Sequence, residues 1–136
     1  PGKPITALHD AVTRVIVEGL IDLRVLRGSI DRLLEKKAYL PYYPHQTSHW
    51  LGLDVHDPGD YSSSGNARVL EPGMVFTIEP GLYFRPEITK DIAEHLSGIA
   101  IRIEDDVLVT EDGCEILSGG LPTSASEIEE LVGVSR

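Results

Sequence analysis

The chain has little cysteine and few basic residues, and both shortages limit what it can be. It has one cysteine, Cys114, among 136 residues. An internal disulfide is therefore impossible, and the fold does not depend on an oxidising compartment. Lys and Arg number 12 against 22 Asp and Glu, a formal net charge of -10, and this charge repels phosphate backbones and anionic lipid surfaces. We therefore expect no nucleic-acid or membrane partner and a cytoplasmic location.

Long apolar runs are also absent from the sequence. No segment approaches the roughly 20 apolar residues of a transmembrane helix, and residues 1–10 lack the charged and apolar regions of a secretory signal. No internal repeat or low-complexity segment divides the chain. Its length suits one compact domain.

Three helices are predicted from apolar spacing and capping residues. Apolar residues recur every three or four positions over residues 5–23, as in an amphipathic helix with one buried stripe. A shorter helix is predicted over residues 29–39, with Ser29 at its N-cap. Near the end of the chain, Ser126 is the predicted N-cap of a last helix, and Glu129 would complete a capping box.

Strands are predicted where apolar and polar residues alternate. Residues 74–79 and 98–110 both alternate in this way, and residues 62–66 between the helices and strands are expected to form a plain loop. Asp112 and Gly113 predict a turn that joins the second run to a short return strand.

The stretch PHQTSHWLGLDVHDPGDY, residues 44–61, holds three of the five histidines and three aspartates. The aspartates Asp54, Asp57 and Asp60 are explained as turn formers. A histidine in a loop is usually a hydrogen-bonding surface residue, so the spacing of His49 and His56 is weak evidence by itself. Alternation along LGLDVH would nevertheless aim His56 at a site that His49 borders.

Two glutamates strengthen this evidence, although glutamates at strand ends are usually solvated. Glu79 closes an apolar strand just before Pro80, and Glu104 shares a strand face with Arg102 between isoleucines. An unpaired charge buried there would cost several kcal/mol. With His49 they form a set of one imidazole and two carboxylates, which suits Mn, Fe, Co or Zn in a hydrolytic site rather than structural zinc.

Three motifs in order, TSHWLGLDVHD, LEPGMVFTIEPGLY and GIAIRIEDDVLVT, closely resemble the C-terminal part of the Xaa-Pro aminopeptidases (aminopeptidase P) of the pita-bread metallopeptidase family. The helical stretch before the first motif is similar as well, so the resemblance covers most of the chain. It implies an α+β fold, the C-terminal half of a pita-bread fold, with a curved antiparallel sheet and flanking helices. Residues 1–136 would then be a single partial domain.

The resemblance also implies a hydrolase with two divalent metal ions, typically manganese, with cobalt or zinc as alternatives. Such enzymes release the first residue of peptides whose second residue is proline. His49, Glu79 and Glu104 match three metal ligands of the family, and Glu79 matches the residue that handles the proton of the attacking water.

Four further positions match supporting residues of the family. His45 and His56 would line the substrate site, and His56 would also act in catalysis by bonding the scissile peptide or a developing oxyanion. Arg102 and Tyr83 would lie just outside the ligands and hold them in place. One position departs from the family: Gln46 stands where a glycine usually follows the first histidine, and its side chain could narrow the pocket.

The family's two aspartate ligands lie upstream of the first helix, and nothing before Ile5 can supply them. Three protein ligands of the usual five remain, and we expect an upstream half to precede Pro1. By itself the chain should be inactive, bind metal weakly and self-associate or form a homo-oligomer through exposed apolar faces.

Two other functions stay open. A prolidase, which cleaves Xaa-Pro dipeptides, has similar motifs, and Trp50 beside the ligand favours the aminopeptidase. A non-catalytic pita-bread module would bind peptides or proteins without hydrolysis. Such modules have lost ligands, whereas the three positions here carry metal-competent residues, and aspartates on the preceding strands would decide the question.

Overall fold

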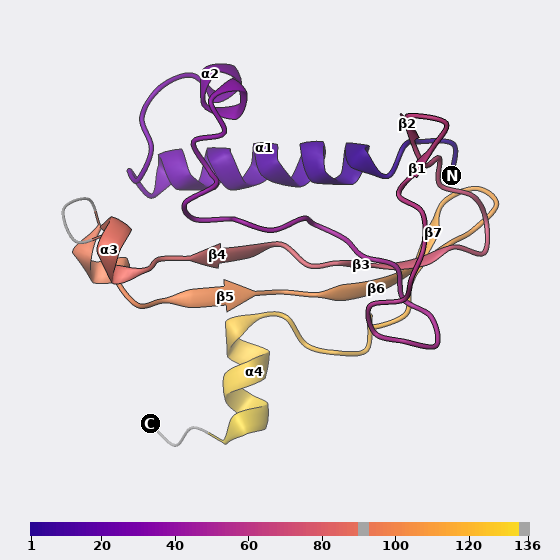
Figure 1. Ribbon diagram of the computed structural model, residues 1–136. Helices are drawn as coiled ribbons and strands as arrows, with labels where there is room; N and C mark the ends of the chain where they lie inside the picture. The colour runs from indigo at the N-terminus through magenta and orange to yellow at the C-terminus, as the bar shows by residue number, and fades with distance from the viewer. Residues whose placement is uncertain (90–92, 134–136) are drawn as a thin grey trace.

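The computed structural model describes residues 1–89 and 93–133. Its helices are α1 (Thr6–Asp22), α2 (Ile30–Glu35), α3 (Pro86–Thr89), the 3-10 helix η1 (Glu94–Leu96) and α4 (Ala125–Val132). Its strands are β1 (Ser62–Ser63), β2 (Asn66–Ala67), β3 (Val75–Ile78), β4 (Gly81–Tyr83), β5 (Ala100–Arg102), β6 (Asp105–Val109) and β7 (Cys114–Ile116). Figure 1 shows a long ribbon of strands with α1 along one side and α4 on the other.

Helix α1 forms because its apolar stripe has a surface to cover. Val17 and Leu20 are completely buried and pack in one cluster with Tyr39, Tyr42 and Tyr43, which follow α2. Burying a side chain of this size stabilises a fold by about 1.5–3 kcal/mol. The cluster fixes α1 against the segment that leads to the first histidines, and the predicted first helix is confirmed.

The main strand pairs share one antiparallel register. In β3 and β6, Val75 lies opposite Leu108 and Ile78 opposite Asp105. The same register continues in β4 and β5, where Gly81 lies opposite Arg102. Residues 79–80 and 103–104 interrupt this ladder, and Pro80 cannot donate to it because it has no N–H. The prediction of one strand over residues 98–110 was therefore wrong, since that stretch forms two strands with a break at Ile103 and Glu104.

A second apolar cluster packs against β3 and β6. Phe76, Val107 and Val109 are buried there with Ile5 and Leu70. Strand β7 extends this sheet, because β6 and β7 pair in antiparallel fashion across the predicted turn at residues 112–113. The α+β architecture with an antiparallel sheet and flanking helices is confirmed.

Three local predictions are corrected by the structure. The predicted plain loop over residues 62–66 is wrong, since β1 and β2 form a small hairpin with Ser64 and Gly65 at positive φ, as a two-residue turn of this kind requires. Ser29 stands at the N-cap of α2 without a capping hydrogen bond from its side chain. The N-cap of α4 is Ser124 rather than Ser126, and Glu127 is its partner.

Among the residues that the structure describes, no helix combines the length and the apolar character needed to cross a membrane.

Candidate metal centre

His49 lies on an extended segment that runs beside β3. The N–H of Thr77 donates to the His49 carbonyl (3.0 Å), and the N–H of Glu79 donates to the Thr47 carbonyl (2.8 Å). These bonds continue the sheet and hold His49 next to the end of β3. Within the side chain, His49 Nδ1 lies 3.0 Å from the Trp50 carbonyl oxygen. A carbonyl only accepts, so Nδ1 carries the proton and Nε2 is left as the free ligand atom.

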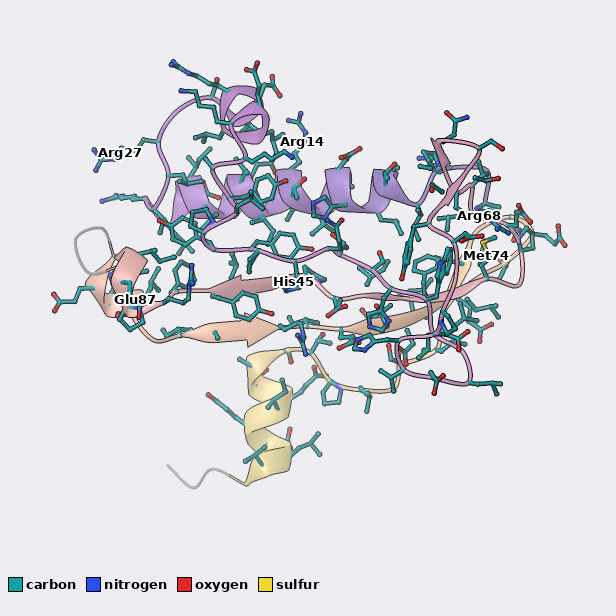
Figure 2. The ribbon with its side chains drawn as sticks, in the orientation of Figure 1. Arg14, Arg27, His45, Arg68, Met74 and Glu87 are labelled. Atoms are coloured by element: carbon teal, nitrogen blue, oxygen red, sulfur yellow. The ribbon has the colours of Figure 1, made fainter. Side chains whose placement is uncertain are left out.

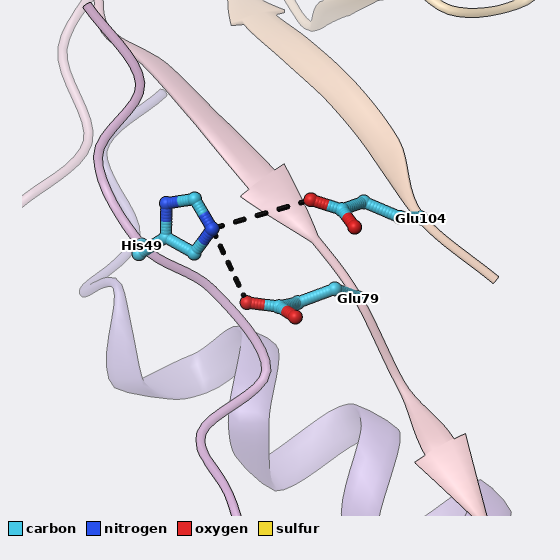
Figure 3. Close-up of side chains that lie close together, drawn as sticks. All are labelled: His49, Glu79 and Glu104. Carbon is cyan, nitrogen blue, oxygen red and sulfur yellow. Dashed lines mark ion pairs between the residues drawn. The ribbon is translucent and has the colours of Figure 1, made fainter. Parts of the chain in front are cut away.

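Glu79 and Glu104 lie at the interruption of the ladder, one residue beyond the last pair of β3 and β6. The common register therefore places the two carboxylates across from each other. Like charges opposite one another destabilise a sheet, so this pair needs a compensating positive charge. Figure 3 shows both carboxylates directed at the His49 ring from neighbouring segments of the chain.

The three side chains converge on one point. His49 Nε2 lies 3.3 Å from Glu79 Oε1 and 4.0 Å from Glu104 Oε1, and one ligand atom from each residue lies within 4.8 Å of the others. A neutral His49 would direct the Nε2 lone pair at carboxylate oxygens, which is unfavourable unless a cation lies between them. The donor set and its spacing therefore fit a divalent metal of the Mn, Co or Zn type.

Arg102 supplies a positive charge behind the carboxylates. Its Nε lies 3.7 Å from Glu79 Oε2 and 4.0 Å from Glu104 Oε2. A hydrogen bond with Tyr83 is the largest cause that raises the pKa of Arg102, and the charge of Glu79 adds to it. No ion partner for Glu79 is evident from the sequence. Arg102 lies beside it because the β4–β5 pairing sets Arg102 opposite Gly81, two residues after Glu79.

Tyr83 lies between Arg102 and His45. Its hydroxyl lies 2.9 Å from His45 Nε2, and His45 Nδ1 lies 2.8 Å from the Gln46 carbonyl oxygen. Both nitrogens of His45 thus have partners that fix the ring. Figure 2 shows His45 near the middle of the molecule, whereas Arg27 and Glu87 point outward at its edge.

A tight turn brings His56 back to His49. The N–H of Asp57 donates to the Trp50 carbonyl (3.1 Å), and Asp57 Oδ1 accepts from the N–H of Asp54 (3.2 Å). The rings of His49 and His56 are 4.4 Å apart. The two histidines meet through this bend rather than through the expected strand alternation, because residues 51–56 form no strand. Asp57 stabilises the turn, as its role of turn former predicts.

The site opens into a cavity of about 530 Å³. Five of the residues singled out from the sequence line it: His45, His49, His56, Glu79 and Arg102. Gln46 lines it too. Glu104 and Tyr83 are not among the lining residues, and they contact those that are.

Sequence reasoning missed three residues at this site. His9 of α1 lines the cavity, as does Tyr61, whose hydroxyl accepts from the N–H of Trp50. Thr47 is 1% exposed and contacts His9. Only one signal could have found His9: it lies one helical turn after Ile5 on the buried side of α1. The contacts of the other two depend on tertiary packing.

Comparison with known proteins places the chain in a well-populated group. Residues 1–111 match the family described as metallopeptidase family M24. The chain is 45% identical over 136 residues to the Xaa-Pro aminopeptidase of Escherichia coli and 45% identical over 132 residues to that of Haemophilus influenzae. These alignments cover 100% and 97% of the chain, and each covers 30% of the relative.

Solved structures agree. Aminopeptidase PepP of Pseudomonas aeruginosa superposes with a TM-score of 0.92 at 47% identity, over 98% of this chain and 30% of that one. Zn-substituted aminopeptidase P of Escherichia coli, solved with product, gives a TM-score of 0.89 at 45% identity, over 100% and 30%. The chain thus spans about 30% of the length of the proteins it matches. The predicted resemblance and the pita-bread type of fold are confirmed.

Proposed function

The chain belongs to metallopeptidase family M24, and from this premise we propose that it is part of the catalytic domain of a Xaa-Pro aminopeptidase. The observation that carries the proposal is the meeting of His49, Glu79 and Glu104 within 4.8 Å at the break in the ladder. The names of its relatives, Xaa-Pro aminopeptidases from several bacteria, support the substrate class. The substrates would be peptides with proline in the second position.

We propose further that residues 1–136 form one partial domain and that two aspartate ligands come from outside it. The relatives are more than three times as long as the matched region, since it covers 30% of them. Three donors are too few to hold two metal ions well. A complete site would also bury Arg102, whose side chain is 51% exposed here. A location in the cytoplasm belongs to the same proposal.

His49, Glu79 and Glu104 would hold two divalent ions, with manganese preferred and cobalt or zinc as alternatives. When bound, such ions supply Lewis acidity that makes an attacking water more acidic near neutral pH. Glu79 would accept the proton of that water and return it to the leaving amine. The position of Glu79 suits this role. Its backbone is held by the hydrogen bond from its N–H to the Thr47 carbonyl, and its side chain is only 14% exposed.

The remaining groups would position the peptide. His56, which is exposed beside the His49 ring, would donate to the carbonyl oxygen of the scissile bond as negative charge develops there. His45, held by Tyr83, would contact the substrate nearby. Arg102 would keep both glutamates oriented, as partners behind metal ligands do. The nitrogen of an Xaa-Pro bond belongs to a tertiary amide and has no proton, so the site must recognise the prolyl ring by its shape.

The test uses the full-length protein with Xaa-Pro-Yaa peptides, Xaa-Pro dipeptides and matched Xaa-Ala-Yaa peptides. We expect hydrolysis of the first group only, loss on chelation and recovery with Mn²⁺. In the His56→Ala variant, which has no donor at this position, kcat should fall by roughly 10²- to 10³-fold, the cost of losing an oxyanion donor. Hydrolysis of dipeptides alone would identify a prolidase. Peptide binding without hydrolysis by the metal-loaded protein would identify a binding module.

A further inference from the structure

The helix side of the cavity carries a histidine that the proposed mechanism does not use. His9 lies on α1 and lines the same cavity as His49 and Glu79. Its Nδ1 lies 2.9 Å from the Thr47 hydroxyl, 38 residues away in sequence. The Thr47 hydroxyl in turn lies 2.7 Å from the Tyr43 hydroxyl. Tyr43 is completely buried and Thr47 is 1% exposed.

These three groups form a chain of hydrogen bonds that has one favourable direction. Each hydroxyl has a single proton to donate. If Tyr43 donates to Thr47, then Thr47 donates to His9 Nδ1, and both buried protons are satisfied. In the opposite direction the Tyr43 proton would have no acceptor among the described residues, which is costly in a buried site. Burial also raises the pKa of Tyr43, so its hydroxyl stays protonated.

The direction of this chain determines the tautomer of His9. With Nδ1 as an acceptor, the proton of the neutral ring is on Nε2. Burial lowers the pKa of His9, which favours the neutral ring. Nε2 has no hydrogen-bond partner in the part of the chain that the structure describes. A fixed N–H donor therefore belongs to a residue that lines the cavity.

We propose that His9 is a substrate-binding residue whose Nε2–H donates to a carbonyl oxygen of the bound peptide, while Thr47 and Tyr43 hold its tautomer. The inference rests on the proposed function, because it assumes that peptides occupy this cavity. It adds a contact from the helix wall to the contacts that the sheet side supplies. Because His9 is neither a proposed metal ligand nor the proposed oxyanion donor, its bond should form equally in the ground state and the transition state.

Two substitutions separate this role from a structural one. In the full-length protein, His9→Gln keeps an N–H near the position of Nε2, and His9→Asn keeps a group near Nδ1 only. We expect His9→Asn to raise KM roughly 2- to 12-fold with kcat nearly unchanged, as loss of one neutral hydrogen bond to substrate should. His9→Gln should retain most of the affinity. The matched control is His95→Asn, since His95 is exposed on η1 and outside the cavity.

The proposal would be overturned if His9→Asn had a KM near that of the wild type and His9→Gln had a raised KM. The hydrogen bond between His9 and Thr47 would then have a structural role only. Failure of the proposed function looks different, because the wild-type protein would then not hydrolyse Xaa-Pro peptides at all.

A measurement on the wild-type protein that needs no enzymatic activity also tests the proposal, even where a variant does not fold. Long-range ¹H–¹⁵N correlation spectra of the wild-type protein report which ring nitrogen of each histidine carries the proton. We expect His9 to show a protonated Nε2 and an unprotonated, hydrogen-bonded Nδ1. Thr47→Val should remove this preference. A proton on Nδ1 in the wild type would contradict the proposal.

Discussion

Among single residues, Glu104 is the proposed ligand whose removal tests the candidate metal centre most directly. Its carboxylate lies 4.0 Å from His49 Nε2 and across the broken ladder from Glu79. We predict that Glu104→Gln in the full-length protein weakens Mn²⁺ or Zn²⁺ binding by at least roughly 10- to 100-fold, the range known for groups that merely support a ligand. Isothermal titration measures this. Glu111→Gln, an exposed acidic residue beyond β6, is the matched control and should leave the affinity unchanged.

The protonation of His9 links stability to pH. Burial lowers the pKa of His9 below its ordinary 6.5; Asp10 opposes this shift, and His45 and Lys37 add to it. The unfolded chain therefore binds a proton at this ring at a higher pH than the folded chain does. The stability linked to His9 is complete above 6.5 and is lost as pH falls from 6.5 towards the folded pKa.

We predict a smaller loss of unfolding free energy between about pH 7.5 and about pH 5.5 in His9→Gln than in the wild type. Urea unfolding at the two pH values measures it. An equal loss in both proteins would show that His9 titrates normally in the fold.

Some site residues can be found from a short sequence pattern, whereas others are brought to the site only by tertiary contacts. His49, Glu79 and Glu104 could be singled out because each stands in a short pattern with a proline, tryptophan or arginine beside it. Thr47 could not, since the His9 atom that it contacts belongs to a residue 38 positions away, and for His9 the only signal is its place one helical turn after Ile5. Tyr61 was missed because its contact with the backbone N–H of Trp50 depends on how the loop between the two residues folds back.

Among the helices, α4 has two serines near its start, and only Ser124 caps it. The Ser124 hydroxyl accepts from the N–H of Glu127 and caps the helix, whereas Ser126 lies inside its first turn. Losing such a cap costs about 1 kcal/mol. Because α4 has no buried residue, we predict local fraying: amide hydrogen exchange in α4 should be about fivefold faster in Ser124→Ala. Ser126→Ala should change it little, and equal effects would refute the capping assignment.

The strands show why element boundaries were harder to predict than element types. Alternation continues through residues 98–110 and indicates one strand. The ladder nevertheless breaks at Pro80, which has no N–H to offer the opposite strand. The break lies across from Ile103 and Glu104, so a backbone feature of one segment ends a strand in another. The alternation along residues 98–110 cannot show where the opposite segment has a proline. The same break in the ladder places the carboxylates of Glu79 and Glu104 beside His49.

Across the fold, an apolar groove lies between α1 and the β4–β5 pair. Its volume is about 420 Å³, and Ile16, Leu23, Leu82 and Ile101 are among its lining. The exposed fraction of Ile101 is 60%. Large apolar side chains left in water in this way favour association.

We predict that residues 1–136, expressed alone, self-associate with increasing concentration in sedimentation velocity. Ile101→Lys should weaken the association at least roughly tenfold, since one isoleucine per copy leaves the contact. Leu121→Lys changes a residue that is 70% exposed but outside the groove, and it should have no such effect. A monomer at all concentrations would contradict the prediction.

Residues 1–136 alone should also lack the metal binding and the activity of the longer protein. Within the described residues, one group of potential ligands meets, and it offers one imidazole and two carboxylates. Two divalent ions would need more donors than these, so we predict that residues 1–136 alone bind Mn²⁺ weakly and do not hydrolyse Xaa-Pro-Yaa peptides. The full-length protein, measured side by side, should bind two ions and be active. Metal content after dialysis, titration with Mn²⁺ and peptide hydrolysis are the measurements. Two tight sites with activity in the isolated chain would mean that other carboxylates of this chain complete the centre, and that no external aspartates are needed.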